Sequence, residues 1–233
     1  KIFFISASGG KKDFTKTNLK KIYKSLQSEQ KKYSIKLSGG DTNFSRTLSF
    51  TIAFIGYSKK KPVLRKGAKL NDDIYITNTI GDSYVGLSIL KKKKKIYKSK
   101  YFINCFYKPN IPFEFGKKII NFANCSIDLS DGLYQDMAHL SNSSNYFFKI
   151  NINKIPISKN LKNFLNRENL KPKKFISKGD DYQILFTASK KKRSFISRIA
   201  KNTRTLITRV GVVTSKKPKF VAKNEGYIHS FNQ

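Results

Sequence analysis

The stretch that most constrains the fold is CSIDLSDGLYQDMAH, residues 125–139. Within it, Ile127 and Leu129 alternate with polar residues, which is the period of a β-strand. From Leu133 onward the apolar residues stand three or four positions apart, which is the spacing of one helix face. The stretch therefore predicts a strand, a sharp turn and a helix in direct succession.

The turn between this strand and helix carries two carboxylates and a hydroxyl, those of Asp128, Asp131 and Ser130. Free backbone N–H groups and the helix dipole at the start of a helix favour phosphate oxygens. Two carboxylates would repel a phosphate unless hard divalent cations lie between them. The turn thus indicates a nucleotide bound with magnesium. An ordinary alternative is equally open: Ser130 or Asp131 caps the helix, and Asp128 is simply exposed.

The net charge of +34 does not by itself indicate a nucleic-acid-binding protein. Such proteins usually have arginines for bidentate contacts and a concentrated basic face. Here only seven residues are arginine, and the lysines are scattered along a chain that is also rich in Asn, Ile, Phe and Tyr. This pattern favours compositional drift, so no specific nucleic-acid partner is expected, although polyanions should be attracted in a salt-sensitive way.

The sequence contains neither a membrane span nor a zinc motif. No run approaches 18 apolar residues, and the start KIFFISASGG is too short for a signal peptide, so the cytoplasm is the expected location. Cys105 and Cys125 form no CxxC motif, which disfavours zinc, and a disulfide is not expected in a reducing compartment. Both cysteines are expected to be small buried side chains.

The first part of the chain predicts one helix and several strands. Residues 15–32 have the apolar spacing of an amphipathic helix, and 33–38 predict a strand that ends in a turn at GGDT, residues 39–42. Two glycines permit close approach of the backbone to a ligand, but an ordinary turn explains them as well. Residues 47–55 alternate as a strand, and the polar SKKKP at 58–62 indicates a domain boundary.

The rest of the chain mixes strands with amphipathic helices, which predicts an α/β or mixed α+β class. Asp180 and Asp181 are explained as simple turn residues before a strand. The expected strands are 74–77, 146–150, 205–213 and 219–222. One helix is expected after residues 81–82, and others at 115–123, 159–166 and 190–201. Residues 101–113 are expected to be a connection.

Four stretches, in this order, resemble thiamine-monophosphate kinase of the aminoimidazole-ribonucleotide-synthetase-like superfamily. They are GGDT at 39–42, RKGAKLNDDIYIT at 65–77, IDLSDGLYQDMAH at 127–139 and GDDYQILFT at 179–187, followed by GYIH at 226–229. The resemblance implies ATP-dependent phosphorylation of thiamine monophosphate to thiamine diphosphate with Mg²⁺. It also implies two α/β domains, of which the first is incomplete here, and a homodimer if that domain is complete.

The resemblance assigns residues 1–60 to the C-terminal part of an ATP- and magnesium-binding domain and 61–233 to a C-terminal α/β domain. It implies no catalytic acid or base, because the nucleophile is already a phosphate oxygen and catalysis is positioning plus charge neutralisation. The implied ATP contacts are Tyr23, Gly40, Asp41, Arg65 and Ser130; the implied magnesium ligands are Asp41, Asp128 and Asp131; the implied substrate contacts are Gln183 and Tyr227.

Gln183 stands where the family usually has glutamate, so Gln183→Glu is expected to keep or raise activity. His139 and His229 are expected to be structural. Three alternatives remain open: another ATP-using member of the superfamily, such as aminoimidazole ribonucleotide or selenophosphate synthetase; a pseudoenzyme that keeps nucleotide affinity; and a basic RNA-associated protein. Binding to RNA through scattered lysines should collapse with rising salt, whereas specific Mg-ATP binding should not.

Overall fold

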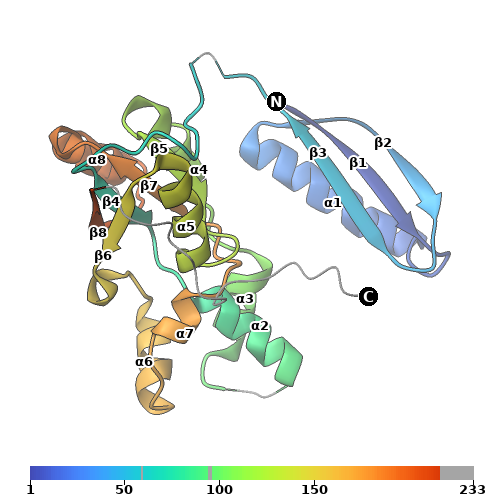
Figure 1. Cartoon of the computed structure of the whole chain (residues 1–233). Helices are drawn as coiled ribbons and strands as arrows, with labels where there is room; N and C mark the ends of the chain where they lie inside the picture. The colour runs from blue at the N-terminus through green and yellow to red at the C-terminus, as the bar shows by residue number, and fades with distance from the viewer. Residues whose placement is uncertain (59, 94–95, 216–233) are drawn as a thin grey trace. The chain divides into compact units, whose positions relative to one another are not determined.

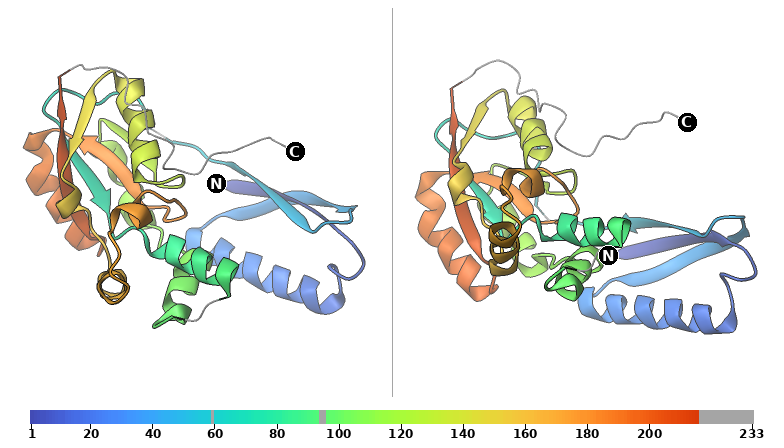
Figure 2. Two further views of the ribbon diagram at one scale, coloured as in Figure 1. Left: turned by 60° about the horizontal axis from the view of Figure 1, so that its bottom comes forward. Right: turned by 90° about the horizontal axis from the view of Figure 1, so that it is seen from below.

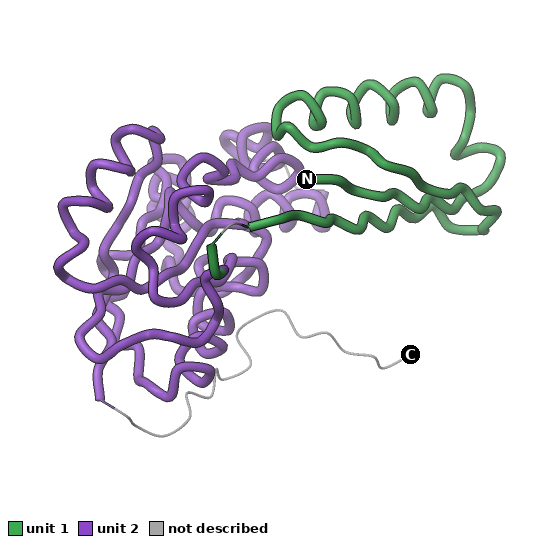
Figure 3. Tube along the Cα trace, turned by 90° about the horizontal axis from the view of Figure 1, so that it is seen from above, with its two compact units in different colours: residues 1–61 green, residues 62–233 purple. Residues whose placement is uncertain are grey.

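The computed structural model describes residues 1–58, 60–93 and 96–215, and the chain divides into two compact units. Figure 3 shows the units in two colours, Lys1–Lys61 in green and Pro62–Gln233 in purple. Among the helices in these described ranges, none has the combination of length and apolar character needed to cross a lipid bilayer.

The first unit is a three-stranded sheet with one long helix. Strand β1 (Ile2–Gly9) is central, parallel to β2 (Lys36–Phe44) and antiparallel to β3 (Ser49–Ile55). Helix α1 (Lys16–Tyr33) runs along one face of the sheet (Figure 2). It begins at the cap residue Thr15, whose side chain accepts a hydrogen bond from a main-chain N–H of the first turn. The helix expected at 15–32 and the strand expected at 47–55 are therefore confirmed, whereas the strand expected from 33 begins at Lys36.

The turn expected at GGDT is wrong, because β2 continues through these residues to Phe44. Gly40 lies opposite Ile5 of β1, and a Cβ at Gly40 would lie only 2.1 Å from the Ile5 carbonyl oxygen. The glycine is therefore required by close packing of two strands. A strand with an internal glycine and a glycine turn have the same sequence signature, which explains the error.

The second unit is built on a five-stranded antiparallel sheet in the order β5-β7-β4-β8-β6. The central strand is buried along its whole length, as expected for a strand covered on both faces. The strands are β4 (Asp73–Thr77), β5 (Cys125–Asp128), β6 (Phe147–Ile150), β7 (Ile184–Ala188) and β8 (Ile207–Thr214).

Helices cover both faces of this sheet (Figure 1). On one face α5 (Leu133–Ser144) packs its apolar side chains into the main core. On the other, α8 (Arg193–Asn202) packs on a second core that includes Tyr75 and Phe186, whose rings stack at 5.1 Å. The unit therefore has three layers, with the sheet between the helices.

A third core joins α2 (Asp82–Lys92), α3 (Ser99–Tyr107), α6 (Lys159–Arg167) and α7 (Lys173–Ile176). Helix α3 overturns the connection expected over 101–113. Its Phe102 is fully buried, and α2 approaches so closely at Gly86 that a Cβ there would lie 2.1 Å from the Phe102 carbonyl oxygen. The prolines at 109 and 112 favour a connection in the sequence, but they follow the helix, which ends at Tyr107.

Smaller differences concern the neighbouring segments. The helix expected over 115–123 is instead α4 (Phe113–Gly116) and a 3₁₀ turn, η1 (Ile119–Asn121), while η2 (Ile152–Lys154) and η3 (Lys190–Lys192) are further 3₁₀ turns. Cys125 is buried as expected, but Cys105 is only partly buried. The strand expected at 219–222 lies outside the described residues.

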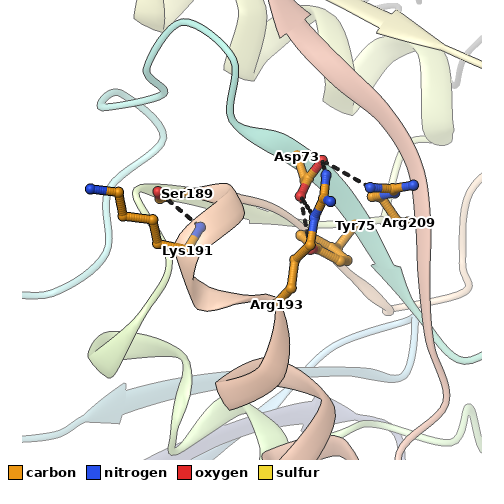
Figure 4. A network of polar contacts seen from close by, with 6 residues as sticks. All are labelled: Asp73, Tyr75, Ser189, Lys191, Arg193 and Arg209. Atoms are coloured by element: carbon orange, nitrogen blue, oxygen red, sulfur yellow. Dashed lines mark hydrogen bonds and ion pairs between the residues drawn. The ribbon is translucent and has the colours of Figure 1, made fainter.

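An ion pair between the buried Asp73 of β4 and the exposed Arg193 of α8 links this helix to the sheet (Figure 4). Asp73 is 2% exposed and accepts two hydrogen bonds from Arg193, at 2.6 Å from Nε and 2.8 Å from a terminal nitrogen. Tyr75 also donates to Asp73, and Arg209 lies 3.5 Å away. Burial works to raise the pKa of Asp73, but the bonds and charge of Arg193 outweigh it and lower that pKa.

Candidate active site

The acidic turn predicted from the sequence lies between β5 and α5. Strand β5 ends at Asp128, α5 begins at Leu133, and the residues between them form the sharp turn. Gly132 has φ +116°, and a Cβ there would lie 2.2 Å from the Ser177 carbonyl oxygen. Only glycine fits this position, because the turn needs both a left-handed backbone and close packing. The strand, turn and helix succession is confirmed.

The backbone N–H groups at this turn are not all free, contrary to expectation. The N–H groups of Asp131 and Gly132 both donate to one carboxylate oxygen of Asp136, each at 3.1 Å. Asp136 is 1% exposed, and burial raises its pKa to about 7 against the effect of these hydrogen bonds. The start of α5 is therefore capped by its own residue Asp136, and these two N–H groups are already engaged in hydrogen bonds.

Sequence reasoning missed Asp136, although one signal was available. An acidic residue in the first turn of a helix commonly satisfies the unpaired N–H groups there. In the sequence, Asp128 and Asp131 account for an acidic turn by themselves, so no separate role for Asp136 is predicted.

The two exposed carboxylates of the turn have an aromatic and a third carboxylate beside them. Asp128 is exposed, and Asp131 is partly exposed. Burial raises the pKa of Tyr182, and so do the charges of Asp180, Asp128 and Asp131 in that order. Asp180, explained from the sequence as a turn residue, is thus brought to the acidic turn together with Tyr182.

The loop 179–183 is fitted closely against the turn. The N–H of Asp180 donates to the Ser130 carbonyl at 2.9 Å, and the N–H of Tyr182 donates to the Leu129 carbonyl at 2.9 Å. In the opposite direction, the Leu129 N–H donates to the Gln183 carbonyl at 2.7 Å. Because three main-chain hydrogen bonds join them, the turn and the loop form one rigid unit.

Gln183 lies behind this unit, with its side chain 3% exposed and its amide fully engaged. Its Oε1 accepts from Thr77 Oγ1 at 3.0 Å and from Asn78 Nδ2 at 2.9 Å. Its Nε2 donates to the carbonyls of Asn110 at 3.0 Å and Asp181 at 3.1 Å. A direct substrate contact would require one of these bonds to break, so the contact expected from the sequence stays a prediction.

The carboxylates of the turn fit a magnesium ion that is shared with phosphate. Among the described residues, no three His, Cys, Asp or Glu side chains are grouped closely enough to hold a metal alone. Mg²⁺ is usually held by only one or two protein carboxylates together with water and substrate phosphates. Asp128 and Asp131 provide such a pair.

The remaining predicted residues do not gather at this turn within the second unit. Arg65 belongs to that unit and is exposed before β4. Tyr23 on α1, which is 62% exposed, belongs to the first unit, and so do Gly40 and Asp41 on β2. The Asp41 carboxylate accepts a hydrogen bond from the Thr42 N–H at 2.8 Å. Their roles therefore stay predictions.

The sequence assigns structural roles to two histidines and a thiamine contact to one tyrosine. His139 is exposed on α5, so a packing role is wrong for it and a hydrogen-bonding role stays a prediction. Tyr227 and His229 lie outside the described residues.

Comparison with known proteins decides the family. No protein-family model matches the chain. However, it is 36% identical over 230 residues to the thiamine-monophosphate kinase of Buchnera aphidicola subsp. Acyrthosiphon pisum, covering 91% of this chain and 69% of that protein. The chain belongs to the thiamine-monophosphate kinase family. The family predicted from the four motifs is therefore confirmed.

Solved structures of thiamine-monophosphate kinases share the fold of this chain. The structure described as AaThiL complexed with AMPPCP and TMP is 27% identical, with a TM-score of 0.83, over 99% of this chain and 74% of that one. Thiamine monophosphate kinase from Aquifex aeolicus, also 27% identical, has a TM-score of 0.80 over 93% of this chain and 71% of that one. The mixed α/β, aminoimidazole-ribonucleotide-synthetase-like fold is thus confirmed.

Proposed function

We propose that the chain transfers a phosphoryl group from ATP to thiamine monophosphate, which gives thiamine diphosphate. The observation that carries this proposal is the acidic turn at 128–131, fitted against the loop 179–183, in a member of the thiamine-monophosphate kinase family. A structural relative described as a complex with AMPPCP and TMP further supports an ATP-type donor and a thiamine monophosphate acceptor.

The proposed chemistry depends on position and charge. A phosphate oxygen of thiamine monophosphate is already anionic at neutral pH, so no general base is needed, and in-line alignment with neutralisation of charge supplies the catalysis. Asp128 and Asp131 would hold Mg²⁺, which neutralises phosphate charge when it is bound. Ser130 offers a hydroxyl beside them for a hydrogen bond to ATP.

The other assignments rest on the family motifs. In the second unit, Arg65 would contact ATP and Gln183 the thiamine substrate. A homodimer and a cytoplasmic location also belong to the proposal, since the family resemblance implies them. In the first unit, Tyr23, Gly40 and Asp41 would contact ATP, and Asp41 would also bind Mg²⁺. Near the chain end, Tyr227 would contact the thiamine ring, because the face of a tyrosine can stack on a cationic aromatic ring.

The direct test is product formation. The chain is incubated with ATP, Mg²⁺ and thiamine monophosphate, and thiamine diphosphate is separated and quantified. Product should form at a rate proportional to enzyme concentration, and it should disappear when Mg²⁺ is chelated. A folded chain that binds Mg-ATP but makes no product would contradict the proposal and support the pseudoenzyme.

A further inference from the structure

The loop that packs against the acidic turn has a strained backbone. Asp180 and Tyr182 both lie in the left-handed region, with φ of 67° and 50°. This conformation costs about 1–2 kcal/mol for a residue such as Tyr182 and less for Asp180, since aspartate tolerates it better. Such strain persists only where surrounding contacts enforce it. Asp181 lies between the two strained residues, so its contacts decide whether the loop keeps its shape.

Asp181 ties the buried side of the loop to helix α2. Its side chain is 5% exposed and accepts a hydrogen bond from the Gly81 N–H at 2.8 Å, across 100 positions of the sequence. Gly81 is the residue that caps the start of α2. Its hydrogen bond to a buried carboxylate is of the strong, charge-assisted kind when the carboxylate is ionised. The place of the loop is therefore set by α2.

The two aspartates of the loop face different surroundings. Burial raises the pKa of Asp181 to about 8, and the charge that adds to this effect is that of Asp82 on α2. Burial and the charge of Asp131 also raise the pKa of Asp180, whereas the charge of Lys91 on α2 lowers it. The main-chain N–H of Asp180 donates to Ser130 of the acidic turn, whereas the side chain of Asp181 accepts from Gly81 at the start of α2.

The loop 179–183 and the acidic turn are packed so closely that a shift of the loop would also move the turn. Gly179 packs so closely that a Cβ there would lie 1.6 Å from the Ser130 carbonyl oxygen. The hydrogen bonds from Asp180 to Ser130 and from Tyr182 to Leu129 leave little freedom between the two segments. The turn therefore takes its position from the loop, and the loop takes its position from Asp181.

We propose that Asp181 is a positioning residue of the active site: by fastening the loop 179–183 to α2, it sets the place of Ser130 and Asp131 for phosphoryl transfer. This inference rests on the function proposed above. Asp181 is not assigned any contact with ATP, magnesium or thiamine monophosphate, since its carboxylate is directed to α2.

The test compares three variants by two measurements. Asp181→Ala removes the hydrogen-bond acceptor, whereas Asp181→Asn keeps an acceptor oxygen of the same shape and is expected to fold. Asp73→Asn is the matched control, because Asp73 is an equally buried carboxylate whose partner Arg193 lies away from the site. Each is compared with the unsubstituted chain.

Amide hydrogen exchange measures the positioning itself, whether or not the chain has activity. In Asp181→Ala, the amides of Asp180 and Tyr182 should exchange about tenfold faster relative to those of β6, a strand that contains neither substituted residue. Asp181→Asn and Asp73→Asn should leave that ratio unchanged. Equal exchange ratios in Asp181→Ala and the unsubstituted chain would overturn the proposed anchoring.

Steady-state kinetics measures the consequence for catalysis. In Asp181→Ala, kcat should fall about 100-fold, the scale of a misalignment near 1 Å, while KM for ATP changes little. Asp181→Asn should keep kcat within about threefold of the unsubstituted chain, since it rescues the same hydrogen bond.

An equal loss of kcat in Asp181→Asn would mean that the charge itself acts, which overturns a positioning role. Loosened exchange without any loss of kcat would also overturn it, whereas an inactive unsubstituted chain would refute the proposed function alone.

Discussion

At the scale of single residues, Gln183 illustrates how much a role depends on hydrogen-bond partners. Its amide oxygen accepts twice and its amide nitrogen donates twice, all within the protein. A glutamate would keep the acceptors but place a carboxylate against the carbonyls of Asn110 and Asp181. This geometry predicts that Gln183→Glu lowers stability, while the expectation that it keeps or raises activity stays a prediction.

We expect Gln183→Glu to lower the free energy of unfolding by about 1–3 kcal/mol, since the buried carbonyl of Asp181 and the carbonyl of Asn110 lose their donor. Urea unfolding at pH 7 measures the change. Asn163→Asp, the same amide-to-acid change at an exposed position of α6, should stay within about 0.5 kcal/mol. A Gln183→Glu chain as stable as the unsubstituted one would show that the amide donors are not needed.

Asp131 belongs to the same scale, because its carboxylate is assigned to magnesium. Asp131→Asn should weaken Mg-ATP binding by about 10- to 100-fold or more, without unfolding the chain. Calorimetric titration measures the affinity, and Glu168→Gln, at an exposed carboxylate of the same unit, should leave it unchanged. Unaltered affinity in Asp131→Asn would remove this residue from the metal site.

At the scale of elements, the close pairing of β1 and β2 leaves room for a side chain at Gly39 but not at Gly40. A Cβ at Gly40 would lie 2.1 Å from a backbone oxygen of β1, whereas a Cβ at Gly39 would lie 3.5 Å from ring atoms of Phe4. The first distance forces the strands apart, and the second is an ordinary contact.

Gly40→Ala should therefore destabilise the sheet of the first unit by about 1–3 kcal/mol, while Gly39→Ala should not. Amide exchange of β1 and β2 measures the loss locally in both variants. Similar protection in the two variants would be evidence against the close strand contact at Gly40.

The sequence predicted elements well where one period dominates a segment, and poorly where a short helix lies next to prolines. Strand β5 and helix α5 followed directly from their apolar spacing. Helix α3 did not, because it has only nine residues and the prolines at 109 and 112 follow it closely. The link between Asp181 and Gly81 spans 100 positions, and no local pattern encodes it. Motif order identified the acidic turn, but only the folded chain places Asp180 and Tyr182 beside it.

At the scale of the whole molecule, buried carboxylates make stability depend on pH. Asp181 has its folded pKa raised to about 8. The folded chain therefore holds an extra proton between the unfolded pKa, about 4, and 8, so its stability falls as pH rises through that window. Groups that face Asp181 include Asp82 and Ser83 of α2 and Cys105 of α3.

We expect Asp181→Asn to reduce the loss of unfolding free energy between about pH 4 and 8, because one of the groups that titrate there is gone, while Asp136, with its pKa raised to about 7, remains. Urea unfolding at several pH values measures both slopes. Asp73→Asn is the contrasting case: its lowered pKa stabilises the fold above the unfolded value and loses that effect as pH falls. Equal slopes for Asp181→Asn and the unsubstituted chain would show that Asp181 does not titrate in this range.

The most direct test of the central claim is the thermal unfolding midpoint with Mg-ATP alone, and then with thiamine monophosphate added. A ligand that binds only the folded state at 100 times its Kd adds about 2.7 kcal/mol. For a chain of this size, that corresponds to about 5–11 °C. The proposed site predicts an increase with Mg-ATP and a further increase with both ligands. No change with either ligand, in a chain that unfolds cooperatively, would contradict a working kinase site.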